Sequence, residues 1–339
     1  MKIDDVVSGD LPTAADRALS AERDGYDGIW AAEESGHDPL LPLTIAAEHT
    51  ERIQIGTSII VAFGRSPVTL AQAAWDLHRY SGGRFILGLG SQVKAHIERR
   101  YSMPWSHPAP RMREFIAALR AIWSCWQDGG ELNFQGDFYT HTLMTPAFSP
   151  GSSPYGMPKV FLAGVGPGMT KVAGEAADGM LVHGFTTERY LRQVTLPAVA
   201  AGLAARNLTL ADFEMFYPAF VVTGNTKEEM AAAAASTRKR IAFYASTPAY
   251  RGVLELHGWG DLQTDLNALS KQGKWDEMGR LISDDVLDAF AVRGEPHQVP
   301  AVLMKRFGDI IDRLSLYMPY ASDQVAPLVV SGLQELTRQ

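Results

Sequence analysis

The chain has 339 residues, of which 46% are hydrophobic, so it is long enough to bury a large core. Its net charge of −7 comes without a basic stripe, which argues against nucleic acid as the main partner. The sequence contains no apolar run near the roughly 18 residues that a membrane helix needs, and its N-terminus does not resemble a signal peptide. We therefore expect neither a nucleic-acid nor a membrane partner.

Cysteine and histidine usage narrows the chemistry further. Cys125 is the only cysteine, so no disulfide can form within the chain and we expect a reducing, cytoplasmic location. Because Cys125 lies beside an apolar helical stripe, we interpret it as a packing residue rather than a nucleophile. The nine histidines show no metal-ligand spacing, so we expect no metal site.

Taken in chain order, short apolar runs typical of strands alternate with helical patterns. The predicted strands are 3–7, 27–32, 53–61, 84–90, 160–163, 180–182, 213–223 and 313–318. The predicted helices are 12–23, 38–50, 66–80, 112–126, 169–177, 188–206 (bent at Pro197), 226–244, 296–307 and 323–336. Residues 132–141 have the pattern of a β-hairpin.

This alternation predicts a (β/α)8 TIM barrel that forms a single domain over residues 1–339. Two stretches interrupt it and are expected to be insertions after strands four and seven. Residues 91–110 are too irregular for a regular element, and residues 245–293 read as short helical pieces without a strand. A doubly wound sheet is the alternative. It is weaker because Val93 and Met169 stand where the third glycine of a G-x-G-x-x-G motif would be needed.

A glycine-rich turn, Gly164-Val165-Gly166-Pro167-Gly168, joins the fifth predicted strand to the following helix. Glycines allow a sharp turn and a close approach of the backbone to a ligand. The start of the helix directs several free N–H groups to one spot, where they can hold a phosphate. An ordinary turn between a strand and a helix is the equally simple alternative.

In a barrel of this kind, functional side chains lie at the carboxyl ends of the strands. The candidates there are Glu33, Glu34, His37, Arg65, Ser91, Gln92, His96, His183, Tyr317 and Tyr320. Glu33 and Glu34 are neighbours on an extended segment, so they point to opposite sides. For each carboxylate and histidine, a solvated or structural role is the alternative to a chemical one.

Four motifs together resemble the bacterial luciferase-like superfamily, and within it the branch that uses the deazaflavin coenzyme F420. They are D-G-I-W at 27–30, T-E-R-I-Q-I-G-T at 50–57, S-G-G-R-F-I-L-G-L-G at 81–90 and A-G-V-G-P at 163–167. The resemblance implies hydride transfer between coenzyme F420 and a small organic substrate. An FMN-dependent monooxygenase supplied by a separate reductase is the alternative, and a non-catalytic flavin-binding protein is the second alternative. The resemblance also implies a homodimer and a flavin or F420 reductase as redox partner.

The resemblance also implies roles for individual residues. A cis peptide between Ser58 and Ile59 would support the central ring of the coenzyme. The cofactor's phosphate and ribityl chain would contact Gly164, Gly166, Gly168, Met169, Thr170, Ser91 and His96. Glu33 would lie near the ring or the substrate. Relatives commonly carry an Asp-His pair after strand two, whereas this chain has Glu33-Glu34. His37 or His183 is therefore expected to take the histidine's part in proton transfer.

Overall fold

The computed structural model describes residues 1–7, 10–33, 36–318, 320 and 325–338. Eight parallel strands form its centre, each hydrogen-bonded to the next. They are β1 (Lys2–Val6), β2 (Gly28–Ala31), β3 (Gln54–Thr57), β5 (Phe85–Gly90), β8 (Lys159–Gly164), β9 (Gly179–Val182), β10 (Glu214–Val222) and β12 (Arg313–Tyr317). Pairing of β9 with β10 and of β12 with β1 closes the cylinder, as the predicted TIM barrel requires.

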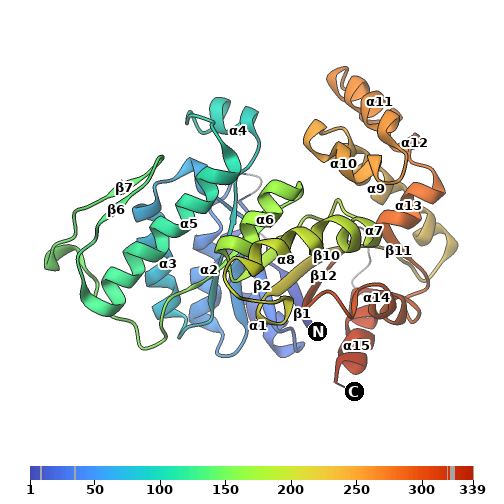
Figure 1. Ribbon diagram of the computed structural model, residues 1–339. Helices are drawn as coiled ribbons and strands as arrows, with labels where there is room; N and C mark the ends of the chain where they lie inside the picture. The colour runs from blue at the N-terminus through green and yellow to red at the C-terminus, as the bar shows by residue number, and fades with distance from the viewer. Residues whose placement is uncertain (8–9, 34–35, 319, 321–324, 339) are drawn as a thin grey trace.

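Helices surround the barrel, as Figure 1 shows. They are α1 (Leu11–Arg23), α2 (Leu40–His49), α3 (Pro67–Tyr80), α4 (Lys94–Arg99), α5 (Pro108–Ser124), α6 (Pro167–Ala176), α7 (Glu188–Tyr190), α8 (Leu196–Ala204), α9 (Lys227–Ala245), α10 (Arg251–Glu255), α11 (Gly260–Lys271), α12 (Trp275–Arg280), α13 (Asp284–Phe290), α14 (Val299–Phe307) and α15 (Val325–Thr337). The apolar stripe of α5, from Met112 to Trp123, is buried, because it is the face turned toward the barrel. The predicted hairpin is present as β6 (Phe134–Gln135) and β7 (Thr140–His141).

The barrel interior is filled at its amino-terminal end. Arg313 and Asp4 form a fully buried pair, with Nε and one terminal nitrogen of the arginine 2.8 and 2.9 Å from the two carboxylate oxygens. The indole N–H of Trp30 donates to the same carboxylate at 2.9 Å. An apolar layer follows, made of Trp30, Ile86, Phe161, Leu181 and Phe216. This end is a packed core, so a ligand can enter only from the carboxyl ends of the strands.

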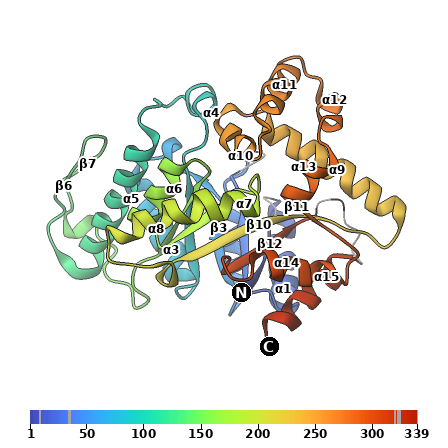
Figure 2. The ribbon, with the colours of Figure 1, turned by 45° about the vertical axis from the view of Figure 1, so that its right-hand side comes forward.

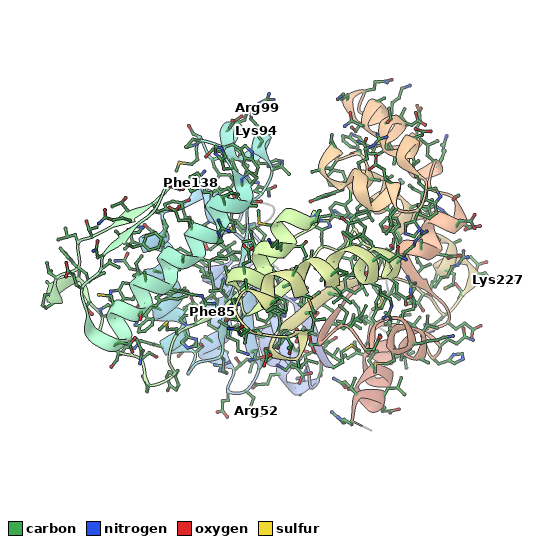
Figure 3. The ribbon with its side chains drawn as sticks, in the orientation of Figure 1. Arg52, Phe85, Lys94, Arg99, Phe138 and Lys227 are labelled. Carbon is green, nitrogen blue, oxygen red and sulfur yellow. The ribbon has the colours of Figure 1, made fainter. Side chains whose placement is uncertain are left out.

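The figures show which end of the molecule carries those carboxyl ends. In Figure 3, Arg52, which precedes β3, lies at the bottom, whereas Lys94 and Arg99 on α4 lie at the top. Figures 1 and 2 both place α4 and the helices α10–α12 at this upper end. Residues 245–293, together with α9, pack around a second apolar cluster that includes Phe185, Phe220 and Phe290.

Two expectations from the sequence are wrong in detail. The stretch 91–110 contains α4 and the start of α5, because Pro108 and Pro110 lie in the first turn of a helix, where no N–H is needed. The stretch 245–293 contains a short strand, β11 (Ala291–Arg293), which pairs with the upper part of β10. Three residues are too few for a periodic signal.

The remaining helices follow the predicted pattern with local differences. Between α7 and α8 the chain forms a π-type turn over residues 191–195, because Pro197 cannot donate a backbone hydrogen bond. The start of the last predicted helix, at Asp323, falls outside the described residues, and α15 is seen from Val325. Within the described part of the chain, no helix is long and apolar enough to span a membrane.

Candidate functional site

The third barrel strand is broken where the cis peptide was expected. The Ser58–Ile59 bond is cis, and the strand resumes as β4 (Ile60–Val61). Backbone hydrogen bonds hold the break to the neighbouring strand, with Ser58 N donating to Ala31 O at 2.8 Å and Glu33 N donating to Ile59 O at 2.9 Å. We call residues 58–59 the bulge.

Residues opposite the bulge explain how the sequence accommodates it. The hydroxyl of Thr57 both donates to Gly88 O and accepts from Gly88 N, each at 2.8 Å, in place of a backbone ladder bond. A Cβ on Gly88 would come 1.7 Å from Thr57 O, so only glycine fits there. Gly90 is constrained less tightly, because a Cβ there would come 2.8 Å from the end of the Ile59 side chain rather than from backbone. The G-L-G motif on β5 therefore leaves the space that the bulge of the neighbouring strand occupies.

The carboxylate of Glu33 lies beside the bulge and is engaged by three donors from other segments. One oxygen accepts from Val61 N at 2.7 Å and from Arg65 at 2.5 Å, and the other accepts from the Tyr101 hydroxyl at 2.9 Å. Arg65 also donates to Asp38 at 3.0 Å. Burial alone would lower the pKa of Arg65, but the pairing with Glu33 and Asp38 raises it. Glu33 is only 9% exposed, and it ties the bulge to two loops at the barrel mouth.

Inward-facing residues at the mouth are small on the side of the bulge. Alternation along the strands from the apolar layer places Ala32, Ser58, Gly90 and Ala163 around the opening above it. Val6, also inward-facing by alternation, is 45% exposed. Small side chains at these positions leave room for a flat group above the core.

The glycine turn provides unblocked backbone donors at the same end. Gly166 is the N-cap of α6, so the N–H groups of Gly168 and Met169 have no acceptor within the helix. A Cβ on Gly166 or Gly168 would meet no atom within 4 Å, whereas at Gly164 it would come 3.1 Å from Met169. Thr170 donates its N–H and its hydroxyl to Gly166 O at 3.1 and 3.0 Å, which fixes the turn. The turn therefore fits a phosphate group, held by backbone N–H groups at the start of a helix.

His183 directly follows β9, and alternation from Leu181 directs it into the mouth. Its Nδ1 accepts a hydrogen bond from Phe185 N at 2.9 Å, and its ring contacts those of Tyr244 and Tyr250 at centroid distances of 4.8 and 4.9 Å. Burial lowers the pKa of His183 to about 4. At neutral pH the ring is therefore uncharged and carries its proton on Nε2, so it is a hydrogen-bond donor.

The other sequence candidates lie at the same end of the barrel but make fewer contacts. His37 is exposed on the loop between β2 and α2, and His96 is exposed on α4. Ser91 follows β5 and is half-buried, with its hydroxyl donating to Gln92 O at 3.1 Å. Glu34 lies outside the described residues. Among the described residues there is no cluster of three or more metal-ligand side chains.

Sequence reasoning did not single out Tyr101, Tyr244 or Tyr250. Tyr101 reaches Glu33 across 68 positions of the chain, and its ring occupies the space beside Gly64, where a Cβ would come within 2.7 Å of it. Tyr244 and Tyr250 lie at the end of α9 and the start of the following segment. Each resembles an ordinary core aromatic residue in the sequence, and only the fold brings them to the mouth.

The parallel eight-stranded barrel, the bulge and the glycine turn at one mouth agree with the resemblance to the luciferase-like superfamily. The chain belongs to the luciferase-like monooxygenase family, whose sequence model matches residues 3–311. An uncharacterized protein of Mycobacterium tuberculosis is 51% identical over 338 residues, which is 100% of this chain and 98% of that protein.

Two further comparisons involve proteins named for coenzyme F420. An F420-dependent glucose-6-phosphate dehydrogenase of Amycolatopsis mediterranei is 31% identical over 211 residues, which is 58% of this chain and 61% of that protein. The solved structure of a coenzyme F420-dependent tetrahydromethanopterin reductase from Methanopyrus kandleri covers 99% of both chains with a TM-score of 0.80 and 21% identity. The likeness to the solved reductase structure shows a shared fold.

Proposed function

We propose that this protein is an oxidoreductase that transfers a hydride between coenzyme F420 and a small organic substrate. The observation that carries the proposal is the joint presence of the bulge, the glycine turn and the uncharged His183 at one barrel mouth. Membership of a family with F420-dependent relatives supports the choice of coenzyme. The deazaflavin supplies a carbon that gives or takes a hydride, and the protein supplies the rest.

The residues of this chain would divide that work. The backbone N–H groups of Gly168 and Met169 would hold the phosphate of the coenzyme tail. The bulge would support the flat ring, with Ser91 and His96 along the chain that links ring and phosphate. His183 would donate a hydrogen bond from Nε2 to a substrate or ring oxygen, without a change in its own charge near neutral pH.

Between the two candidates for contact with the reacting oxygen, the geometry favours His183 over Glu33. Both oxygens of Glu33 already accept hydrogen bonds from the protein, so we assign that carboxylate to positioning the bulge. His37 is exposed, and without a partner in the described structure it would need a bound substrate to orient it. His183 is held by Phe185 N and two tyrosine rings, which fix its direction before any ligand arrives.

A side-by-side titration tests the choice of coenzyme. The full chain is mixed with coenzyme F420 and, separately, with FMN, each followed by its own fluorescence and absorbance. Saturable binding of F420 with little affinity for FMN supports the proposal. Oxygen consumption with reduced FMN, together with no binding of F420, would overturn it in favour of the monooxygenase chemistry for which the family is named. Binding of a cofactor without turnover of any carbonyl or alcohol substrate would leave a flavin-binding protein.

A further inference from the structure

One cationic side chain stands at the mouth without a part in the proposed hydride transfer. Arg240 is an exposed residue of α9, and its guanidinium carbon lies 5.8 Å from the centre of the Tyr244 ring and 5.4 Å from that of Tyr317. Tyr317 ends β12, and alternation from Arg313 directs it inward. The guanidinium therefore lies at the rim of the barrel opening, over two tyrosine rings.

The neighbours of Arg240 on α9 differ from it in their partners. Arg238 pairs with Asp284 at 2.5 Å, and Lys239 pairs with Asp276 at 2.7 Å. Arg240 forms no ion pair with any carboxylate of the described residues. A guanidinium that lies over an aromatic face keeps its N–H edge available for a carboxylate or phosphate. In a chain with a net charge of −7, such a cation at a site opening favours an anionic ligand.

Tyr244 connects this cation to the proposed reacting region. Its ring contacts the guanidinium of Arg240 on one side and the ring of His183, at 4.8 Å and nearly perpendicular, on another. Tyr250 packs against the same histidine. A small molecule between His183 and Arg240 would thus meet a neutral N–H donor at one end, an aromatic wall along its length and a positive charge at the other end.

We propose that Arg240 binds an oxyanion group of the substrate, so that the enzyme acts on small molecules carrying a carboxylate or phosphate. This inference rests on the proposed function, because it assigns the anion to the substrate of that reaction. The binding site itself does not, because it consists of Arg240, Tyr244 and His183 in the protein without coenzyme. The aromatic wall favours a flat or apolar portion between the anion and the group that reacts.

Matched neutral and anionic probes test the site. Benzoate, phenyl phosphate and benzyl alcohol are titrated against the full chain without coenzyme at fixed ionic strength, with binding followed by ligand-observed NMR. We expect the substitution Arg240→Gln to weaken the binding of benzoate or phenyl phosphate by about tenfold. The binding of benzyl alcohol should weaken by less than about twofold. The anion whose affinity falls more in Arg240→Gln identifies the oxyanion that the arginine prefers. Arg240→Lys keeps the charge but not the planar fork, so it should recover part of the loss.

Lys239→Gln is the matched control, since it removes one positive charge from the adjacent position of the same helix, where the side chain pairs with Asp276. The affinity for all three probes should be unchanged in this control. An equal effect of Lys239→Gln and Arg240→Gln on the anions would overturn the proposal, because it would reflect the overall field. An equal fall in affinity for the neutral and the anionic probes in Arg240→Gln would also overturn the proposal.

The coenzyme titration keeps this inference separate from the proposed function. If Arg240→Gln weakens F420 itself, the arginine serves the coenzyme's acidic tail, and the substrate assignment is overturned. If the wild-type protein binds no F420 but shows the anion preference, the coenzyme proposal fails while the anion site stands. If the wild-type protein binds F420 but shows no anion preference, the anion site is overturned while the coenzyme proposal stands.

Discussion

The assignment of Glu33 to positioning makes a sharp prediction about its conservative variant. Glu33→Gln keeps the shape of the side chain, so its carbonyl oxygen can still accept from Val61 N and Arg65. Its amide can donate to the Tyr101 hydroxyl, which can turn to accept. Only the charge is lost, and Arg65 retains Asp38 as a partner. We therefore expect the free energy of unfolding to fall by only about 1–2 kcal/mol.

Glu33→Ala provides the contrast. It leaves the buried donors at Val61 and Arg65 and the Tyr101 hydroxyl without their acceptor, which should cost about 3–5 kcal/mol of stability. Because the bulge is then released from the neighbouring loops, coenzyme affinity should fall as well. Tyr101→Phe removes a single bond and should cost about 1 kcal/mol. Urea unfolding and coenzyme titration of the three variants measure both quantities.

The turnover of Glu33→Gln decides between positioning and proton transfer. If Glu33 only holds the bulge, the glutamine variant should keep turnover within about tenfold, with an unchanged pH profile, while the alanine variant loses it. An amide cannot carry a proton, and loss of a general acid or base costs about 100-fold or more. Loss of that size in Glu33→Gln, with normal stability and coenzyme affinity, would refute the reasoning and restore the catalytic role that the sequence suggested.

Three further outcomes follow from single contacts. Gly168→Ala should fold with equal or higher stability, since its Cβ meets nothing within 4 Å. It should bind the coenzyme at least about tenfold more weakly, because the methyl group enters the space for the phosphate. Unchanged coenzyme affinity in a titration would contradict the phosphate site. Gly88→Ala should give insoluble protein, because its Cβ would come 1.7 Å from Thr57 O, and a normal melting temperature would show that the bulge can yield. The pKa of His183 is about 4 when folded and about 6.5 when unfolded, so its neutral form stabilises the protein above pH 6.5 and this stability is lost as the pH falls toward 4. From pH 7.5 to 5, wild type should lose about 2 kcal/mol more unfolding free energy than His183→Asn; equal losses would place the ring in solvent.

The barrel and the glycine turn at its mouth could be predicted from the sequence because their signals are local. Strand and helix periods recur over a few residues, and the turn at Gly164–Gly168 is readable as a string of glycines. The family resemblance implied the position of the cis peptide, and the structure has it at Ser58–Ile59. Local composition also explains one error, since prolines in the first turn of α5 resembled an irregular loop.

The contacts of Glu33 with Tyr101 and Arg65 could not be predicted in this way. Tyr101 approaches Glu33 from the segment after α4, and Arg65 approaches from beyond the bulge. Such pairings depend on how the loops at the mouth fold over one another, and no pattern within either segment encodes them. A carboxylate at the end of a strand therefore has the same appearance in sequence whether it moves a proton or secures a loop.

The two sides of the mouth are built on different principles, and this difference bears on how the protein can change its chemistry. One side consists of backbone groups and small residues: the bulge, the glycine turn and the small inward residues of β2 to β8. The opposite side uses the side chains of α9 and of the segment that follows it, which pack around their own apolar cluster. We therefore expect substitutions at Arg240, Tyr244 or Tyr250 to alter which substrate is accepted, while the backbone groups that would hold the coenzyme keep their geometry.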